Sequence, residues 1–225
     1  MKAVLFDLGG VLISAPQLVI ARYEKSLGLP SGGLTVAFVR GAPNNAFCRL
    51  ETGELTLSEF APLFEKECQL ATGQLGIQLP SSFSARTLFE NIRAASAVNQ
   101  RMFQAASKLK QNGYLIGILT NNWIDESDET RAEFMSLLNQ HFHVVVESCK
   151  EGVRKPDKAA FRIACERLKT DPQDVIFLDD LGVNVKAARQ MGMHTILVRD
   201  TQTALQQLSD LTGVDVHSDK QTSKL

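Results

Sequence analysis

The hydrophobic pattern along the chain alternates between short apolar runs and longer segments with apolar residues at every third or fourth position. The short runs contain few polar positions, which is typical of strands buried on both faces. Between the later runs lie amphipathic patterns that predict helices. Strand, helix and strand in this order indicate an α/β fold with a parallel sheet covered by helices. The predicted strands are residues 3–6, 114–119, 143–146, 175–178 and 195–198, and the helices between them include residues 158–168 and 183–191.

The segment between the first two predicted strands is too long for one crossover helix. Apolar spacings of three and four residues predict several helices within it, and glycine and proline clusters separate them. We therefore expect a helical cap of residues 16–96, inserted after the first strand of a core formed by residues 1–15 and 97–216. A polar tail, residues 217–225, is expected to lack fixed structure. The predicted cap helices are residues 17–27, 57–69 and 84–95.

Composition narrows the functional classes. Apolar residues make up 44% and charged residues 22% of the chain, and 24 basic side chains balance 25 acidic ones. This balance argues against disorder and against a partner such as nucleic acid or an anionic membrane. No apolar run approaches the roughly 20 residues that span a bilayer. Four cysteines without a CxxC pair favour a reducing compartment over a disulfide framework.

Polar residues follow the predicted strands, at the edge where parallel sheets bind their ligands. Asp7 ends the first strand and is followed by Leu8, Gly9 and Gly10, so this carboxylate is a candidate nucleophile or metal ligand beside an accessible backbone. A turn-capping aspartate is the alternative. Thr120 and Asn121 end the second strand and offer a hydroxyl and amides to a phosphate oxygen, although local turn chemistry explains them as well.

Two further groups have the same position relative to a strand. Lys155, in the sequence GVRKPD, is presented by a turn that Pro156 restricts, or it is an ordinary surface lysine. Asp179 and Asp180 end the fourth strand, and Asn184 opens the next helix. Two adjacent acids at this point favour a cation such as Mg²⁺, because helix capping explains one acid better than two.

The ordered set of these residues, with a helical insertion after the first, resembles the haloacid dehalogenase superfamily over nearly the whole chain. Within it the chain is similar to the N-terminal phosphatase domain of soluble epoxide hydrolases. We expect the epoxide-hydrolysing domain to be absent, because the sequence stops at Leu225. The resemblance implies a Rossmann-like core. It rests on the stretches TGELTLSEFAPLFEKEC, ILTNNW, VVVESCKEGVRKPD, VIFLDDLGVNVKAARQMGM and TILVRDTQTALQQL.

The resemblance also implies a mechanism. An aspartate at the position of Asp7 attacks the phosphorus of a phosphomonoester, and water then hydrolyses the aspartyl-phosphate. Charge neutralisation and positioning account for most of the catalysis of phosphoryl transfer. The implied Mg²⁺ ligands are the carboxylates of Asp7 and Asp180 and the backbone carbonyl of Gly9. The phosphate would be held by Thr120, the backbone amide of Asn121 and Lys155, with Asp179 orienting Lys155 and Asn184 in support.

Gly9 departs from the family pattern, which has a second aspartate at this position as general acid and base. Losing such a group typically costs about 10² to 10⁴ in rate. Three hypotheses therefore stay open. The chain is a Mg²⁺-dependent phosphatase, a catalytically silent domain used for binding or regulation, or a metal-free dehalogenase. The adjacent acids Asp179 and Asp180 count against the dehalogenase, because such a pair is poorly suited to a site that must hold no cation.

The insertion gives the only indication of substrate. Similarity to the epoxide hydrolase domain suggests lipid phosphates, but most of the phenylalanines in the insertion are expected to form its own core. Trp123, three residues after Thr120, is better placed to contact a substrate. The phenylalanines are Phe38, Phe47, Phe60, Phe64, Phe83 and Phe89.

The last three residues, Ser223, Lys224 and Leu225, match the peroxisomal address that an import receptor reads. We therefore expect a peroxisomal protein, with the cytoplasm as the alternative. The expected partners are a phosphate ester and this receptor, without nucleic acid or a membrane span, and a homodimer is left open.

Overall fold

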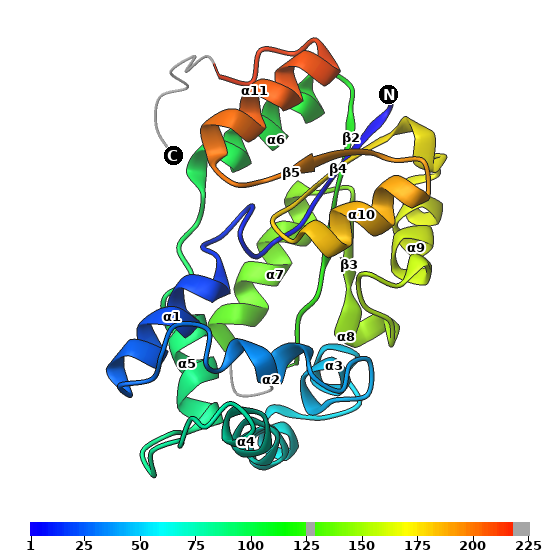
Figure 1. The fold of residues 1–225 in the computed structure, drawn as a ribbon. Coiled ribbons are helices and arrows are strands. Elements are labelled where there is room, and N and C mark those ends of the chain that lie inside the picture. The colour runs from blue at the N-terminus through cyan, green and yellow to red at the C-terminus, as the bar shows by residue number, and fades with distance from the viewer. Residues whose placement is uncertain (125–128, 218–225) are drawn as a thin grey trace.

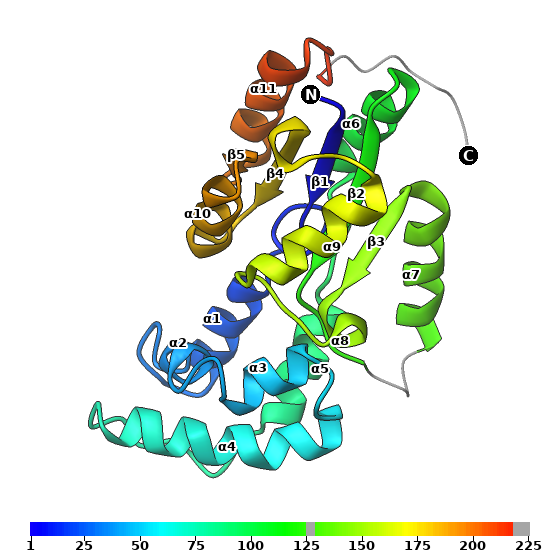
Figure 2. The same cartoon turned by 90° about the vertical axis from the view of Figure 1, so that its right-hand side faces the viewer.

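A computed structural model describes residues 1–124 and 129–217 of the chain. Its centre is a five-stranded parallel sheet with the order β3-β2-β1-β4-β5 (Figures 1 and 2). The sheet confirms the predicted α/β fold. The expected address at residues 223–225 lies outside the described residues and stays a prediction. The strands are β1 (Ala3–Phe6), β2 (Leu115–Thr120), β3 (Val144–Glu147), β4 (Val175–Asp179) and β5 (His194–Leu197).

Helices cover both faces of the sheet. Val4 and Phe6 of β1 point to a cluster with α6, α7 and α11, whereas Ala3 and Leu5 point to a second cluster with α9 and α10. This alternation within one strand explains why β1 is apolar throughout. The helices of this part are α6 (Gln100–Gln111), α7 (Glu129–His141), α8 (Ser148–Glu151), α9 (Lys158–Leu168), η1 (Pro172–Asp174), α10 (Gly182–Gln190) and α11 (Thr201–Thr212).

The residues between β1 and α6 form a separate layer of helices. Figure 2 shows this layer beyond the carboxyl ends of β1, β2 and β3. The longest of its helices begins with a capping box, in which Thr56 and Glu59 satisfy each other's backbone N–H groups. The helices are α1 (Pro16–Ser26), α2 (Thr35–Val39), α3 (Ala46–Glu51), α4 (Leu57–Gly73) and α5 (Ala85–Ala94). We call residues 16–96 the cap, and the rest of the described chain the core.

The cap has its own apolar interior. Phe60, Phe64 and Phe89 are buried, and Phe38, Phe47 and Phe83 pack against them. The ring centroids of Phe60 and Phe64 lie 4.9 Å apart, and those of Phe60 and Phe89 lie 4.8 Å apart. Such aromatic pairs stabilise the fold by more than the burial of their surface area alone. The expectation that these aromatics are mostly core residues of the cap is confirmed.

The observed bounds differ slightly from the predicted ones. β2 and β3 begin one residue later than predicted and also end one residue later, because Thr120 still pairs with Glu147 in the ladder. α4 continues to Gly73, four residues beyond the predicted end. All four cysteines are buried, and none of them forms a disulfide. Among the described residues, no helix is long and apolar enough to cross a membrane.

Candidate active site

Asp7 lies where the ladder of β1 ends. Phe6 pairs with Leu178, and the backbone N–H of Asp7 donates to the Leu178 carbonyl at 2.8 Å, which continues this register by one residue. Asp7 therefore stands beside Asp179, the last residue of β4. Its side chain is almost fully buried, and its Oδ1 accepts the backbone N–H of Leu8 at 2.7 Å.

Lys155 reaches this point from the turn between α8 and α9. Its Nζ lies 2.8 Å from Asp7 Oδ1 and 2.7 Å from Asp179 Oδ2, and its side chain is 1% exposed. Asn121, just after β2, accepts the backbone N–H of Lys155 at 2.8 Å and donates to its carbonyl at 2.9 Å. The side chain of Asn121 thus fixes the turn that presents the lysine, in addition to the predicted role of its backbone amide.

Asp179 is completely buried, and both of its oxygens are used within the protein. Oδ1 accepts the backbone N–H of Leu181 at 2.8 Å. The amide of Asn184 donates to both oxygens, at 3.1 and 3.0 Å. Asp179 Oδ2 also contacts Lys155 Nζ. These contacts fix the carboxylate in place, so it can orient the lysine.

The charges of the site depend on one another. Burial lowers the pKa of Lys155, but the carboxylates of Asp7 and Asp179 outweigh this effect and raise it above its ordinary value. These two carboxylates therefore favour the charged form of the lysine. Burial raises the pKa of Asp7 well above its usual range, and the charges of Asp179 and Asp180 add to this, while Lys155 opposes them. Three carboxylates share one ammonium, so the site has an excess of negative charge.

Asp180 lies half-buried next to the glycine pair that follows Asp7. A Cβ on Gly10, whose φ is +73°, would overlap the carboxylate of Asp180, so only glycine allows the backbone this close. Burial and the neighbouring Asp179 raise the pKa of Asp180 to about 6, while the charge of Lys155 and, to a smaller extent, Gln17 act to lower it.

The oxygen atoms at this edge fit a divalent cation. Asp7, Asp179 and Asp180 each offer a carboxylate oxygen, and these atoms lie within 4.8 Å of one another. Because Asp179 is already bound by Lys155 and Asn184, the oxygens that remain for a metal belong to Asp7 and Asp180. Mg²⁺ prefers one or two carboxylates and keeps water on its other positions. An added cation would offset the excess negative charge and would lower the raised pKa values of these two acids.

Thr120, Trp123 and Gly9 occupy the same end of the sheet. Thr120 is buried. Trp123 is partly buried and packs edge-to-face on Phe89 of the cap, with ring centroids 5.0 Å apart, so this core residue joins the cap's apolar cluster. A Cβ on Gly9 would lie 3.4 Å from Pro16 Cδ at the start of α1, in ordinary van der Waals contact.

Three residues near the site had not been expected there from the sequence. Gln17 at the start of α1 lies close enough to Asp180 to lower the pKa of that carboxyl, and Glu51 of α3 pairs with Arg154, which precedes Lys155. Glu51 and Arg154 are separated by 103 positions and belong to no strand end. The sequence carries no periodic signal for such a pair, because only the docking of the cap brings it together.

A family model described as haloacid dehalogenase-like hydrolase matches residues 1–192 of the chain. The chain belongs to this family.

Particular relatives agree with this assignment. The chain is 41% identical to bifunctional epoxide hydrolase 2 of Sus scrofa over 220 residues, which cover 96% of the chain and 40% of that protein. It thus spans about two fifths of this relative. It is 28% identical to a sesquiterpene phosphatase of Aspergillus oryzae over 94% of the chain and 97% of the phosphatase. A family enzyme of Bacteroides thetaiotaomicron, solved with magnesium and inorganic phosphate, has the same fold, with a TM-score of 0.59, 18% identity, and coverage of 90% of this chain and 98% of that one.

Proposed function

We propose that this chain is a Mg²⁺-dependent phosphomonoester hydrolase in which Asp7 is the nucleophile. The observation that carries the proposal is the buried group of Asp7, Lys155 and Asp179 at the carboxyl ends of β1 and β4. It combines a carboxylate at a strand tip, a fixed ammonium and a second carboxylate that orients the ammonium. This arrangement suits a ligand that carries negative charge and an electrophilic centre.

The contacts of Asp7 suggest how the attack is arranged. Leu8 N–H and Lys155 Nζ both bind Oδ1. We assign the attack on phosphorus to the Asp7 carboxylate, which forms the aspartyl-phosphate as the P–O bond of the ester breaks and the alcohol leaves with a proton taken from water. Lys155, the Thr120 hydroxyl and the backbone N–H of Asn121 would hold the phosphoryl oxygens, and water would later attack the phosphorus and release Asp7.

Asp7 and Asp180 would hold Mg²⁺, with the carbonyl of Gly9 as the further predicted ligand. When bound, the ion offsets the repulsion between the phosphate and the carboxylates. The protein's own contribution is to keep the two acids close. Gly10 contributes by having no side chain between the backbone and Asp180.

The missing acid at position 9 favours particular substrates. An ester whose leaving group needs little protonation loses least without a general acid. The same observation supports a second candidate function, a silent domain that binds Mg²⁺ and phosphate without turnover. The metal-free dehalogenase is the least supported, because the carboxylate oxygens of Asp7 and Asp180 lie together at this edge in a way that suits a bound cation.

We further propose that the substrate carries an apolar group. Leu181 and Val183, at the start of α10 beside Asp180, are 41% and 57% exposed. Exposed apolar side chains around a polar site can contact the hydrocarbon part of a ligand. The similarity to a sesquiterpene phosphatase supports the same class, and lipid phosphates belong to it.

The test combines turnover with trapping of the intermediate. The purified protein with Mg²⁺ is expected to hydrolyse p-nitrophenyl phosphate, and the Asp7→Asn variant is expected to be inactive. Borohydride reduction of the working enzyme should convert residue 7 to homoserine, which mass spectrometry detects. Activity that survives in Asp7→Asn would remove Asp7 from the nucleophile role.

A Mg²⁺ titration distinguishes the alternatives. Cation binding without turnover or label at Asp7 would favour the silent domain. Release of chloride from a 2-haloacid in excess chelator would favour the dehalogenase. For the substrate class, kcat/KM should rise from glycerol phosphate to a long-chain alkyl phosphate, and a flat series would contradict the apolar group.

A further inference from the structure

The cap is attached to the core on two sides, and the first is its covalent connection. The two linkers run next to each other, since Ile13 forms an antiparallel bridge with Val98 and Ser14 N–H donates to the Ala97 carbonyl at 2.9 Å. Figure 1 shows the blue and green linkers side by side between the two parts. Motion of the cap relative to the core would have to bend this pair of linkers.

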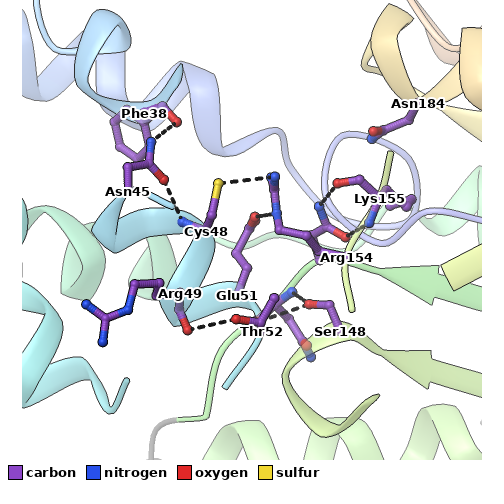
Figure 3. Close-up of polar contacts among 12 residues, drawn as sticks. Phe38, Asn45, Cys48, Arg49, Glu51, Thr52, Ser148, Arg154, Lys155 and Asn184 are labelled. Atoms are coloured by element: carbon purple, nitrogen blue, oxygen red, sulfur yellow. Dashed lines mark hydrogen bonds and ion pairs between the residues drawn. The ribbon is translucent and has the colours of Figure 1, made fainter. Parts of the chain in front are cut away.

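On the second side, α3 of the cap meets the segment around α8 without a covalent connection. The Nε of Arg154 lies 2.5 Å from Oε2 of Glu51, and its guanidinium also donates to Cys48 Sγ at 3.3 Å. Figure 3 shows Arg154 from the core pointing between these two residues of α3. Nearby, a Cβ on Gly53 would overlap the carbonyl oxygen of Cys149, so cap and core backbones touch here.

The ion pair is largely shielded from water. The side chain of Glu51 is 7% exposed and that of Arg154 is 23% exposed. Burial raises the pKa of Glu51, and Arg154 is the strongest influence that opposes this. A buried carboxylate without its cation is unfavourable, so separation of the cap from the core on this side has to break a shielded contact.

Arg154 is also the residue before Lys155. The backbone of Lys155 is bound on the core side by the Asn121 side chain. On the cap side, the neighbouring Arg154 is bound by Glu51. The turn that carries the buried ammonium is therefore held between the two parts, and the contact of the cap is transmitted to it through one peptide unit.

We propose that Glu51 and Arg154 are positioning residues, whose ion pair fastens the unlinked side of the cap to the turn that presents Lys155. The pair keeps the cap over Asp7 and Lys155 and holds the ammonium in place for an incoming phosphate. The role of this pair in catalysis rests on the proposed function. Its role in fastening the cap does not, so the experiment measures both separately.

The experiment compares Glu51→Gln, Arg154→Gln and the double variant. The energies of residues in direct contact are usually coupled. Breaking this pair should therefore raise KM for p-nitrophenyl phosphate about tenfold. The value of kcat should change much less, since the reacting groups remain. The double variant should be no worse than either single variant. Arg154→Lys, which keeps the cation, should recover part of the lost affinity.

Hydrogen exchange provides a measurement that does not depend on turnover. In Glu51→Gln, the amides of residues 46–55 and 150–157 should exchange at least about tenfold faster, while those of β1 and β4 stay protected. If the wild-type protein hydrolyses nothing, the proposed function fails, but this result still decides whether the pair fastens the cap. If Glu51→Gln does not fold, the same exchange pattern is expected in Arg154→Lys, to a smaller degree.

Glu54→Gln is the matched control. It breaks the exposed pair between Arg49 of α3 and Glu54, whose Nε and Oε2 atoms lie 3.3 Å apart, and exposed pairs contribute little. It should leave KM and exchange unchanged. The proposal is overturned if the control has the same effect as Glu51→Gln, if the two single variants are additive, or if exchange of residues 150–157 does not respond to Glu51→Gln.

Discussion

The core and the cap are stabilised by different interactions around the same site. At the carboxyl ends of β1 and β4, buried groups of opposite charge stabilise one another, and Lys155 forms ion pairs with two carboxylates. In the cap, Phe60 and Phe64 belong to an aromatic cluster. A charge cluster loses its function when one member is removed, whereas an apolar cluster tolerates substitutions that preserve its volume. We therefore expect the proposed chemistry to depend on the core, and variation in the cap to alter access and specificity.

The largest effect is expected for Lys155→Met. This change removes the ammonium from the proposed phosphate site and should lower kcat/KM for a phosphomonoester by at least about 10³-fold. It also leaves the buried carboxylates of Asp7 and Asp179 without their ammonium, which should cost about 3–5 kcal/mol of unfolding free energy. Steady-state kinetics and urea denaturation measure the two effects.

Phe60→Leu in the cap is the comparison for this variant. Because the replacement stays apolar, we expect a cost of about 1–2 kcal/mol and a kcat within a few-fold of the original. If Phe60→Leu lowered kcat as much as Lys155→Met, the prediction that catalysis depends on the core and not on the cap interior would be wrong.

Gly9→Asp is expected to have the next largest effect, and in the opposite direction. The backbone of Gly9 is not in the left-handed region, and its Cβ position is in ordinary contact with Pro16. An aspartate there could protonate the leaving alcohol, so turnover of an alkyl phosphate should rise by about 10²-fold. An aryl phosphate should gain much less. A protein that binds Mg²⁺ but shows no gain would favour the silent domain.

Gly10→Ala tests the close approach of the backbone to Asp180. Its Cβ would overlap that carboxylate, so Mg²⁺ should bind at least about tenfold more weakly, a loss of roughly 1.4 kcal/mol. Calorimetric titration of Mg²⁺ gives the affinity.

Gly113→Ala separates this effect from backbone strain. Gly113 also has a positive φ, +86°, but a Cβ there has no atom within 4 Å. Both alanines pay roughly 1–2 kcal/mol for the left-handed conformation. Only Gly10→Ala should weaken Mg²⁺ binding. Equal Mg²⁺ affinities in the two variants would show that Asp180 is not a ligand.

The sequence was sufficient for the parallel sheet because apolar runs and strand ends are local signals. Asp7, Thr120 and Asp179 follow from the register of parallel strands, whose carboxyl ends meet at one edge. Lys155 was a candidate because Pro156 restricts the turn that presents it, and its role toward phosphate came from the family resemblance. Its dependence on the side chain of Asn121 required the structure.

Contacts of the cap were not predictable in the same way. Glu51 and Arg154 meet because two parts dock, and Gln17 reaches Asp180 for the same reason. Docking geometry has no period along the chain. The short helices α2, α3 and α8 were also not predicted, because segments of four to six residues are too short for a helical pattern to be distinguished. The structure was therefore most informative where cap and core meet.

The smallest expected effect is a pH dependence of stability that changes sign with Mg²⁺. Burial raises the pKa of Asp180 from 3.8 to about 6. Without metal, the folded protein therefore binds this proton more tightly than the unfolded chain does between these pH values. The stability of the folded protein should rise as pH falls from 7.5 to 5, by about 2–4 °C in Tm. This gain should disappear as pH rises again through 6.

With saturating Mg²⁺ the same proton competes with the cation, so acidification should instead lower Tm toward the metal-free value. Thermal scans in chelator and in Mg²⁺, at pH 5 and 7.5, measure both slopes. Other acids also titrate in this range, and the Asp180→Asn variant isolates the contribution of Asp180. In that variant the difference between the two slopes should shrink, because residue 180 can neither take up the proton nor hold the cation as a carboxylate. An unchanged difference would assign the cation to other ligands and would leave the negative charge at the ends of β1 and β4 to be balanced by Lys155 alone.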